Sequence, residues 1–190
     1  MEAVADDFLD LAMAKALANP LRQRILRELE LVGEATSTVL AARLGVTSGG
    51  TSYNLRVLAE HGFVEEVRER AHGRQRWWRL TRRSVRFPVR SRQSPELRAA
   101  IEELNRLWLA EDAETFARFQ DVRARMGPWA DAVPYSRGSI RLTLDELAAF
   151  FEDYLALLQK YQRPADETPL EARTVLTRFF AFPEPQEETT

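Results

Sequence analysis

The chain has 190 residues, of which 45% are hydrophobic, and its 27 Lys and Arg against 29 Asp and Glu give a formal net charge of −2. This length allows one or two domains with a proper core, and the composition indicates neither a disordered nor a fibrous protein. The absence of cysteine excludes disulfides, thiolate metal sites and thiol redox sensing. No apolar run is long enough to span a bilayer and the acidic N-terminus is unlike a leader, so we expect a cytoplasmic protein without a membrane partner.

The charge is divided unevenly along the chain. Residues 1–92 contain 16 Lys and Arg and 11 Asp and Glu, whereas residues 93–190 contain 11 and 18. From Arg68 to Arg92 there are ten arginines and one acid, Glu69. Such asymmetry suggests a nucleic-acid-binding half joined to something else. We therefore predict a DNA-binding domain at residues 1–92 and a dimerisation and effector region at residues 93–190.

The first segments predict two helices. Residues 6–17 carry an amphipathic stripe. Asn19 and Pro20 supply the N-cap and first-turn proline of a second helix, whose core face starts at Leu21. Residues 33–35 predict a loop. The outward arginines of the second helix, which we expect to be solvated, are Arg22, Arg24 and Arg27.

The next stretch predicts two further helices and a basic hairpin. Thr36 or Ser37 is the predicted N-cap of a short helix that ends at Gly45, and Thr47 caps another helix that ends at Gly62. Residues 63–67 and 75–81 then predict two strands. Two helices with a glycine-containing joint, followed by a basic hairpin, describe a winged helix-turn-helix, which lays one helix in a DNA major groove.

Several spaced segments also carry a family resemblance: residues 16–22, 24–26, 44–47, 51–58 and 62–64. Together they resemble the opening helices and recognition segment of ArsR-family bacterial transcriptional regulators, over roughly the first half of the chain. The resemblance implies a DNA-binding bacterial regulator. Asn54 stands where the family often carries a histidine. Metal-sensing members use Cys and His clusters, and this chain has no cysteine.

The N-terminal half of a recognition helix points at base edges. Asn54 can pair with adenine, and Arg56 suits a phosphate. Gly49 and Gly50 either allow the backbone to approach DNA closely or mark a frayed first turn. Tyr53 either stacks on the DNA backbone or braces the wing. The predicted DNA-binding residues are Thr47, Ser48, Gly49, Gly50, Thr51, Ser52, Tyr53, Asn54, Arg56, Arg70, His72, Arg74 and Arg76.

The hairpin and the residues after it continue the basic character. We expect the tip at residues 70–76 to meet the minor groove or the DNA backbone. Trp77 and Trp78 alternate across the strand, so one should face the core and the other solvent or a partner. Residues 82–92 form either a linker or a further strand.

A long helix follows. Ser94, Pro95 and Glu96 supply its cap, first-turn proline and first-turn acid, and it ends at Gly127. Its sustained apolar seam favours a second subunit as partner, with packing inside the C-terminal region as the rival. Acids at residues 111–114 interrupt the seam, which suggests a bend or a break there. The predicted dimer residues are Leu97, Ile101, Leu104 and Trp108.

The last third predicts a small strand-helix-strand unit. Residues 139–143 and 173–182 are the strands, and a capping box at Thr143 to Glu146 opens the helix. Its aromatic residues suggest a pocket for a neutral or cationic organic effector, although a plain packed core explains them equally well. The predicted pocket residues are Trp108, Phe150, Phe151, Tyr154 and Phe180.

The sequence as a whole predicts an α+β, mainly helical fold. The chain has no catalytic grouping or metal-ligand spacing, and its only histidines are His61 and His72, so we expect no enzyme, no cofactor and no metal. The favoured function is a sequence-specific DNA-binding transcriptional regulator that acts as a homodimer on double-stranded DNA. The alternative is a winged-helix module that binds proteins. A small-molecule binder without DNA recognition is disfavoured by the arginines around the wing.

Overall fold

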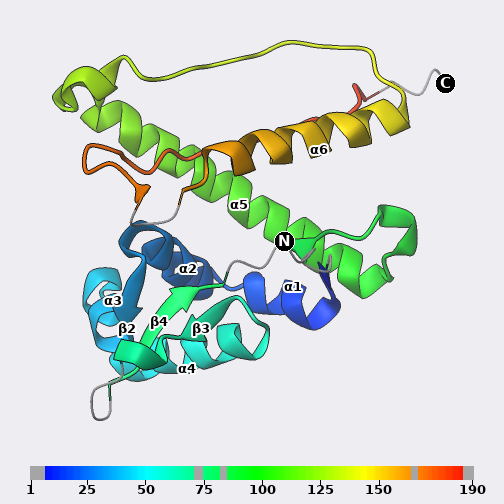
Figure 1. Cartoon of the computed structure of the whole chain (residues 1–190). Coiled ribbons are helices and arrows are strands. Elements are labelled where there is room, and N and C mark those ends of the chain that lie inside the picture. The colour runs from blue at the N-terminus through cyan, green and yellow to red at the C-terminus, as the bar shows by residue number, and fades with distance from the viewer. Residues whose placement is uncertain (1–6, 71–74, 82–84, 164–166, 186–190) are drawn as a thin grey trace. The chain divides into compact units, whose positions relative to one another are not determined.

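The computed structural model describes residues 7–70, 75–81, 85–163 and 167–185 and separates into two compact units, residues 1–131 and 132–190 (Figure 1). The fold is α+β and mainly helical, as the sequence predicts. The helices are α1 Leu11–Leu17, α2 Pro20–Val32, α3 Ser37–Leu44, α4 Ser48–Glu60, α5 Pro95–Val122 and α6 Leu144–Tyr161. The strands are β1 Asp7–Phe8, β2 Glu34–Thr36, β3 Val64–Glu66, β4 Trp77–Leu80 and β5 Val85–Arg86, and short 3-10 helices lie at Arg68–Arg70, Arg90–Arg92, Arg123–Arg125 and Gly127–Ala130.

Side-chain caps start α2, α3 and α4 where the sequence predicts them. Asn19, Thr36 and Thr47 each accept a hydrogen bond from the backbone N–H three residues further along, at 3.1–3.2 Å. Gly45 ends α3 at a φ of 66°, in the left-handed region that a residue without Cβ enters without strain. The predicted start of α3, its end at Gly45 and the predicted start of α4 are therefore confirmed.

A small antiparallel sheet, in the order β2-β4-β3, packs with α2, α3 and α4 (Figure 1). Residues 33–35 were expected to form a loop, but Glu34 pairs with Arg79 and Ala35 with Trp78, because β4 offers these residues a ladder partner. Trp78 is buried and Trp77 is half-buried, which confirms the predicted alternation. The core residues are Ile25, Leu29, Ala35, Leu40, Leu44, Leu55, Leu58, Val64 and Trp78.

The first helix is shorter than the prediction from residue 6. The Asp10 side chain accepts the Met13 N–H at 2.7 Å and so begins α1 at Leu11. The two residues of β1 instead pair in parallel with β5. Residues 85–86 thus form a strand, one of the two alternatives for this stretch.

The first half of α5 packs against α1 of the same chain. Ile101 and Leu104 are buried there, and Leu97 and Trp108 pack at the edge of the cluster. Burial against α1 contradicts the prediction that Ile101 and Leu104 belong to a dimer seam. Leu97 and Trp108 are only half-buried and stay predicted dimer residues. The compact unit that ends at residue 131 therefore includes α5, whereas the predicted functional division falls between residues 92 and 93.

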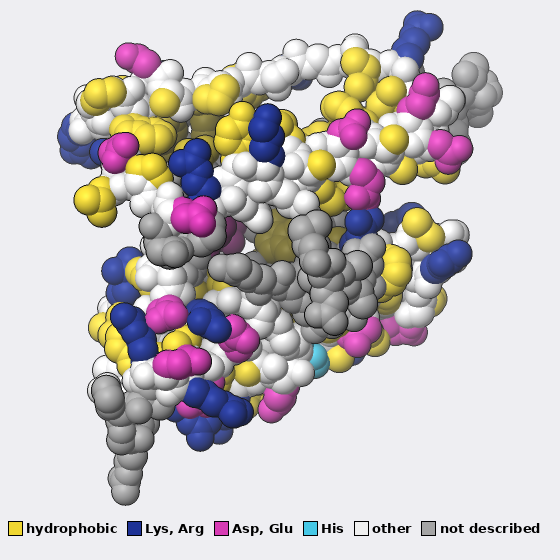
Figure 2. Space-filling view, viewed as in Figure 1, with side chains coloured by type: hydrophobic (Ala, Val, Ile, Leu, Met, Phe, Trp, Pro, Cys, Tyr) yellow, Lys and Arg dark blue, Asp and Glu magenta, His cyan; other side chains and the backbone are white. Residues whose placement is uncertain are grey.

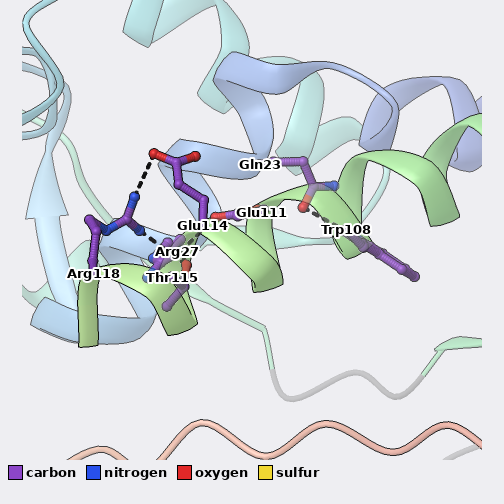
Figure 3. Close-up of polar contacts among 7 residues, drawn as sticks. All are labelled: Gln23, Arg27, Trp108, Glu111, Glu114, Thr115 and Arg118. Atoms are coloured by element: carbon purple, nitrogen blue, oxygen red, sulfur yellow. Dashed lines mark hydrogen bonds and ion pairs between the residues drawn. The ribbon is translucent and has the colours of Figure 1, made fainter. Parts of the chain in front are cut away.

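Polar contacts join the middle of α5 to α2 (Figure 3). Arg27 Nη1 donates to Glu111 Oε1 at 2.9 Å and to Thr115 Oγ1 at 2.5 Å. One turn earlier on α2, Gln23 Oε1 accepts from Trp108 Nε1 at 3.0 Å. The acid at 111 interrupts the apolar seam because it pairs with α2, and α5 runs without a break across it.

The unit at residues 132–190 is built on α6, whose capping box between Thr143 and Glu146 is present as predicted. Residues 139–143 and 173–182 are not strands, so the strand-helix-strand prediction is wrong. Among the described residues neither segment has a partner strand to take its backbone hydrogen bonds. Hydrophobic side chains lie at the surface along α6 (Figure 2), which contains no buried residue. No helix in the described ranges is both long and apolar enough to cross a bilayer.

The Arg27–Glu111 ion pair should measurably stabilise the attachment of α5. Its side chains are 24% and 29% exposed, so solvent screens them only partly. We expect a double-mutant cycle of Arg27→Ala and Glu111→Ala, followed by urea unfolding, to give a coupling free energy of about 1 kcal/mol. The more exposed pair of Arg118 and Glu114 on α5 is the control and should give less than half of that. Strictly additive effects at Arg27 and Glu111 would contradict the attachment.

Candidate nucleic-acid interface

The two faces of α4 differ in burial. Its inner face packs on α2 and α3 through Leu55 and Leu58, which are fully buried. Its outer face is polar, and Tyr53 on it is 61% exposed. Among the predicted DNA-binding residues of α4, the exposed ones are Ser48, Gly49, Tyr53 and Arg56, and the half-buried ones are Gly50 and Ser52.

Two of the predicted base-reading residues lie on the inner face. The Thr51 side chain is fully buried, and its hydroxyl donates to the Thr47 carbonyl at 3.0 Å. Asn54 is 8% exposed, donates through Nδ2 to the Gly50 carbonyl at 2.9 Å and accepts from Arg22 Nη1 at 3.3 Å. Burial contradicts the prediction that these two side chains meet bases. Helical spacing puts them on the same stripe as the core leucines.

A polar groove of about 360 Å³ lies beside the outer face of α4. It is bounded by the start of α3, the middle of α4 and the strand β4 with the residues just before it. Hydroxyl groups and two guanidinium groups line it, and these are the donors that proteins use to hold phosphate oxygens. The lining residues are Thr36, Ser37, Thr38, Ser52, Arg56, Gln75, Arg76 and Trp78.

The arginines at the base of the wing are paired with acids. Arg70 lies 3.2 Å from Glu34, and its guanidinium stands 5.0 Å from the centre of the Trp77 ring. Arg76 lies 3.8 Å from Glu66. These contacts are at the surface, so both guanidinium groups stay accessible, and that of Arg76 also lines the groove.

The other predicted DNA-binding residues are Thr47, Arg56, His72 and Arg74. Thr47 is exposed and serves as the N-cap of α4. Within the described ranges Arg56 has no ion-pair partner, and it lines the groove. His72 and Arg74 lie outside the described residues.

The predicted effector residues fall in different surroundings. Trp108 belongs to the N-terminal unit and meets Phe87 edge to face at 5.8 Å. In the C-terminal unit, the rings of Phe150, Phe151 and Tyr154 lie 4.5–5.7 Å from that of Phe179, which the sequence analysis did not select. Phe180, which it selected, is 60% exposed. No three metal-binding side chains gather among the described residues.

The α2 arginines have a structural role that the sequence did not predict. Arg24 donates to the Leu44 carbonyl at 2.8 Å, and Arg22 and Arg27 bind acceptors on other helices. Arg22 and Arg27 are half-buried, so the expectation that they are solvated is wrong, whereas Arg24 is exposed as expected. No local signal in the sequence could have revealed these bonds, because every acceptor lies on a different helix.

This geometry defines a winged helix-turn-helix domain of the DNA-binding class. Residues 17–67 match the family model described as a helix-turn-helix domain. No curated protein matches the chain.

Similar solved structures include reduced HlyU from Vibrio cholerae, at 29% identity, covering 51% of this chain and 85% of that one, with a TM-score of 0.33. The AntR antimony-specific transcriptional repressor is 27% identical, with 53% and 76% covered and a TM-score of 0.35. An apo mutant of ZitR from Lactococcus lactis is 15% identical, with 78% and 86% covered and a TM-score of 0.33. The helix-turn-helix domain is supported by the family match and by the geometry of α3, α4 and the strand pair β3 and β4. Residues 17–67 of the chain therefore carry a helix-turn-helix domain of the DNA-binding type.

The burial of Thr51 predicts that Thr51→Val acts on stability and not on base preference. Removing its one hydrogen bond should lower the free energy of unfolding by about 1 kcal/mol, as measured by urea denaturation. The order of affinities across a panel of base-substituted duplexes should stay unchanged. Ser52 lines the neighbouring groove, so Ser52→Ala should weaken DNA binding and leave the free energy of unfolding unchanged. A changed base preference in Thr51→Val would contradict the buried placement.

Proposed function

We propose that this protein is a cytoplasmic, homodimeric repressor or activator that recognises a specific DNA sequence through the outer face of α4. One observation carries the proposal: that face adjoins the groove lined by Arg56 and Arg76, while the opposite face is locked into the core. In a dimer, two copies of α4 would enter successive major grooves about 34 Å apart on a near-palindromic site.

The second half of α5 supports the homodimer. Its apolar side chains Leu109, Phe116 and Val122 are 51%, 49% and 39% exposed. Exposed apolar side chains along a long helix are typical of a subunit interface. We assign the dimer contact to this half, because α1 covers the first half.

The aromatic rings of the C-terminal unit support an effector site. Phe150, Phe151, Tyr154 and Phe179 form one ring cluster, in which Tyr154 and Phe179 are stacked at 4.5 Å. Aromatic faces attract apolar or cationic molecules. The proposed effector is therefore a neutral or cationic organic molecule, whose binding would shift the dimer between DNA-competent and DNA-incompetent arrangements.

The test of the proposed function is a fluorescence-anisotropy titration. The full-length protein is mixed with a duplex from the DNA immediately upstream of its own gene, and with a scrambled duplex of equal length, at several salt concentrations. We expect salt-dependent binding with a clear preference for the upstream duplex. No binding to either duplex at low salt would overturn the DNA-binding function and favour the protein-interaction module.

Arg56→Ala should remove one phosphate contact from this complex. Binding should weaken for the upstream and scrambled duplexes alike, and the slope of log K against log salt should fall by about 0.9. The same anisotropy titrations measure both quantities. Arg106→Ala, an exposed arginine on α5, is the control and should leave the slope unchanged. An unchanged slope in Arg56→Ala would contradict the role of the groove.

Gly49→Ala should separate stability from DNA binding. A Cβ at Gly49 would meet nothing within 4 Å, so the fold does not require a glycine there. Alanine should raise the free energy of unfolding by up to ~1 kcal/mol through helix propensity. If the backbone at Gly49 lies against DNA, the added methyl group should weaken binding by about 5- to 30-fold, equivalent to 1–2 kcal/mol.

The matched control is Asn105→Ala, an exposed position on α5 where alanine also raises helix propensity. It should gain stability and keep its DNA affinity, in thermal melts and titrations run beside Gly49→Ala. Unchanged DNA affinity in Gly49→Ala would show that the backbone at Gly49 does not lie against DNA and that the glycine only weakens the first turn of α4.

A further inference from the structure

The Arg22 guanidinium lies between α1, α2 and α4 and has an acceptor on each side. Its Nη2 donates to the Lys15 carbonyl at 3.0 Å and its Nε to the Ala16 carbonyl, both at the C-terminal end of α1. Its Nη1 donates to Asn54 Oδ1 at 3.3 Å on α4. Burial lowers the pKa of Arg22 from its ordinary value, and a partly desolvated cation depends on such acceptors.

The orientation of the Asn54 amide follows from these contacts. A guanidinium group can only donate, so the amide atom that faces Arg22 must be the oxygen. The amide nitrogen is then left to donate to the Gly50 carbonyl at 2.9 Å. Both ends of the amide are thereby engaged inside the protein, and neither remains to pair with a base.

The bond to the Gly50 carbonyl acts on the part of α4 that most needs support. Its first turn contains Gly49 and Gly50, and each glycine costs up to ~1 kcal/mol of helix propensity relative to alanine. The same turn carries the exposed residues that face DNA in the proposed function. A mobile first turn would have to be ordered when DNA binds, and that ordering would reduce affinity.

Arg22 also connects this turn with the long helix. Helix α1 also packs against α5, where Met13 and Leu17 share an apolar cluster with Ile101 and Leu104. The α1 carbonyls that Arg22 binds therefore belong to a helix that α5 holds in place. Arg22 thus links that helix to α4.

We propose that Arg22 and Asn54 are positioning residues for DNA recognition: they fix the first turn of α4 against the end of α1, and neither contacts DNA. The proposal rests on the proposed function and deepens it. It differs from a base-reading role for Asn54 in one measurable respect. A positioning residue alters binding to every operator variant by the same factor, whereas a base-reading residue relaxes discrimination at one base pair.

The test is a double-mutant cycle on the full-length protein. Asn54→Ala removes the amide, and Arg22→Met keeps an unbranched apolar stem without the donors. Each single variant should weaken binding to the upstream duplex by about 5- to 30-fold. The double variant should be no weaker than the weaker single one, because both changes break the same link. Asn54→Ala combined with Arg56→Ala is the control and should show additive losses.

The same variants are titrated against a panel of single base-pair substitutions of the upstream duplex. We expect unchanged ratios between panel members. Additive effects of Arg22→Met and Asn54→Ala, or a loss of discrimination at one base pair in Asn54→Ala alone, would overturn the proposal.

Amide hydrogen exchange in the free protein tests the link without DNA. Asn54→Ala and Arg22→Met should each accelerate exchange in residues 51–55 of α4, while the core strand β4 keeps its protection. Unchanged exchange in α4 would overturn the proposal even if DNA binding fell. If the unaltered protein showed no preference for its upstream duplex, the proposed function would fail, and exchange would still decide whether Arg22 and Asn54 hold the turn.

Discussion

The last carbonyls of α1 are the constraint on which the DNA-binding unit depends. The helix cannot continue through Pro20, which has no N–H, so donors must come from elsewhere. Arg22 and Gln23, in the first turn of α2, donate to the carbonyls of residues 15–17. The same two side chains also bind outward, Arg22 to α4 and Gln23 to Trp108 on α5. Through these two side chains, the C-terminal end of α1 is connected to both α4 and α5.

The ion pairs on the wing are exposed to solvent, unlike the half-buried Arg22 between α1 and α4. Arg79 and Glu65 lie 2.7 Å apart with side chains 46% and 48% exposed, and the hydrogen bond to Glu65 raises the pKa of Arg79. Solvent screens an exposed pair such as this one, so exchanging its carboxylate for a DNA phosphate costs little free energy. Acids beside the wing therefore hold the arginines in place without blocking a nucleic acid. They also moderate the positive charge that the sequence concentrates there.

Local signals in the sequence were sufficient for the helices of the DNA-binding unit and insufficient for its contacts. Asn19, Thr36 and Thr47 cap their helices because a cap involves only neighbouring residues. The strand at residues 34–36 depends on β4, more than forty residues away, and no short-range pattern marks it. The position of Asn54 on the recognition helix predicted a contact with a base. Its side chain instead bonds to Arg22 on α2 and to the Gly50 carbonyl of its own helix. The recognition segment was predictable, and the direction of its side chains was not.

Contacts between distant parts of the chain also determine which part of α5 is free to form the proposed dimer. Apolar periodicity predicts an apolar face along the whole of α5. It does not show which part of that face another helix of the same chain covers. Ile101 and Leu104 lie against α1, and the polar bonds to Glu111 and Thr115 attach the next turns to α2. On α5, exposed large apolar side chains occur only from Leu109 onward. A second copy bound there would act on the helix that Gln23 and Arg27 tie to α2, and through Arg22 on the recognition helix.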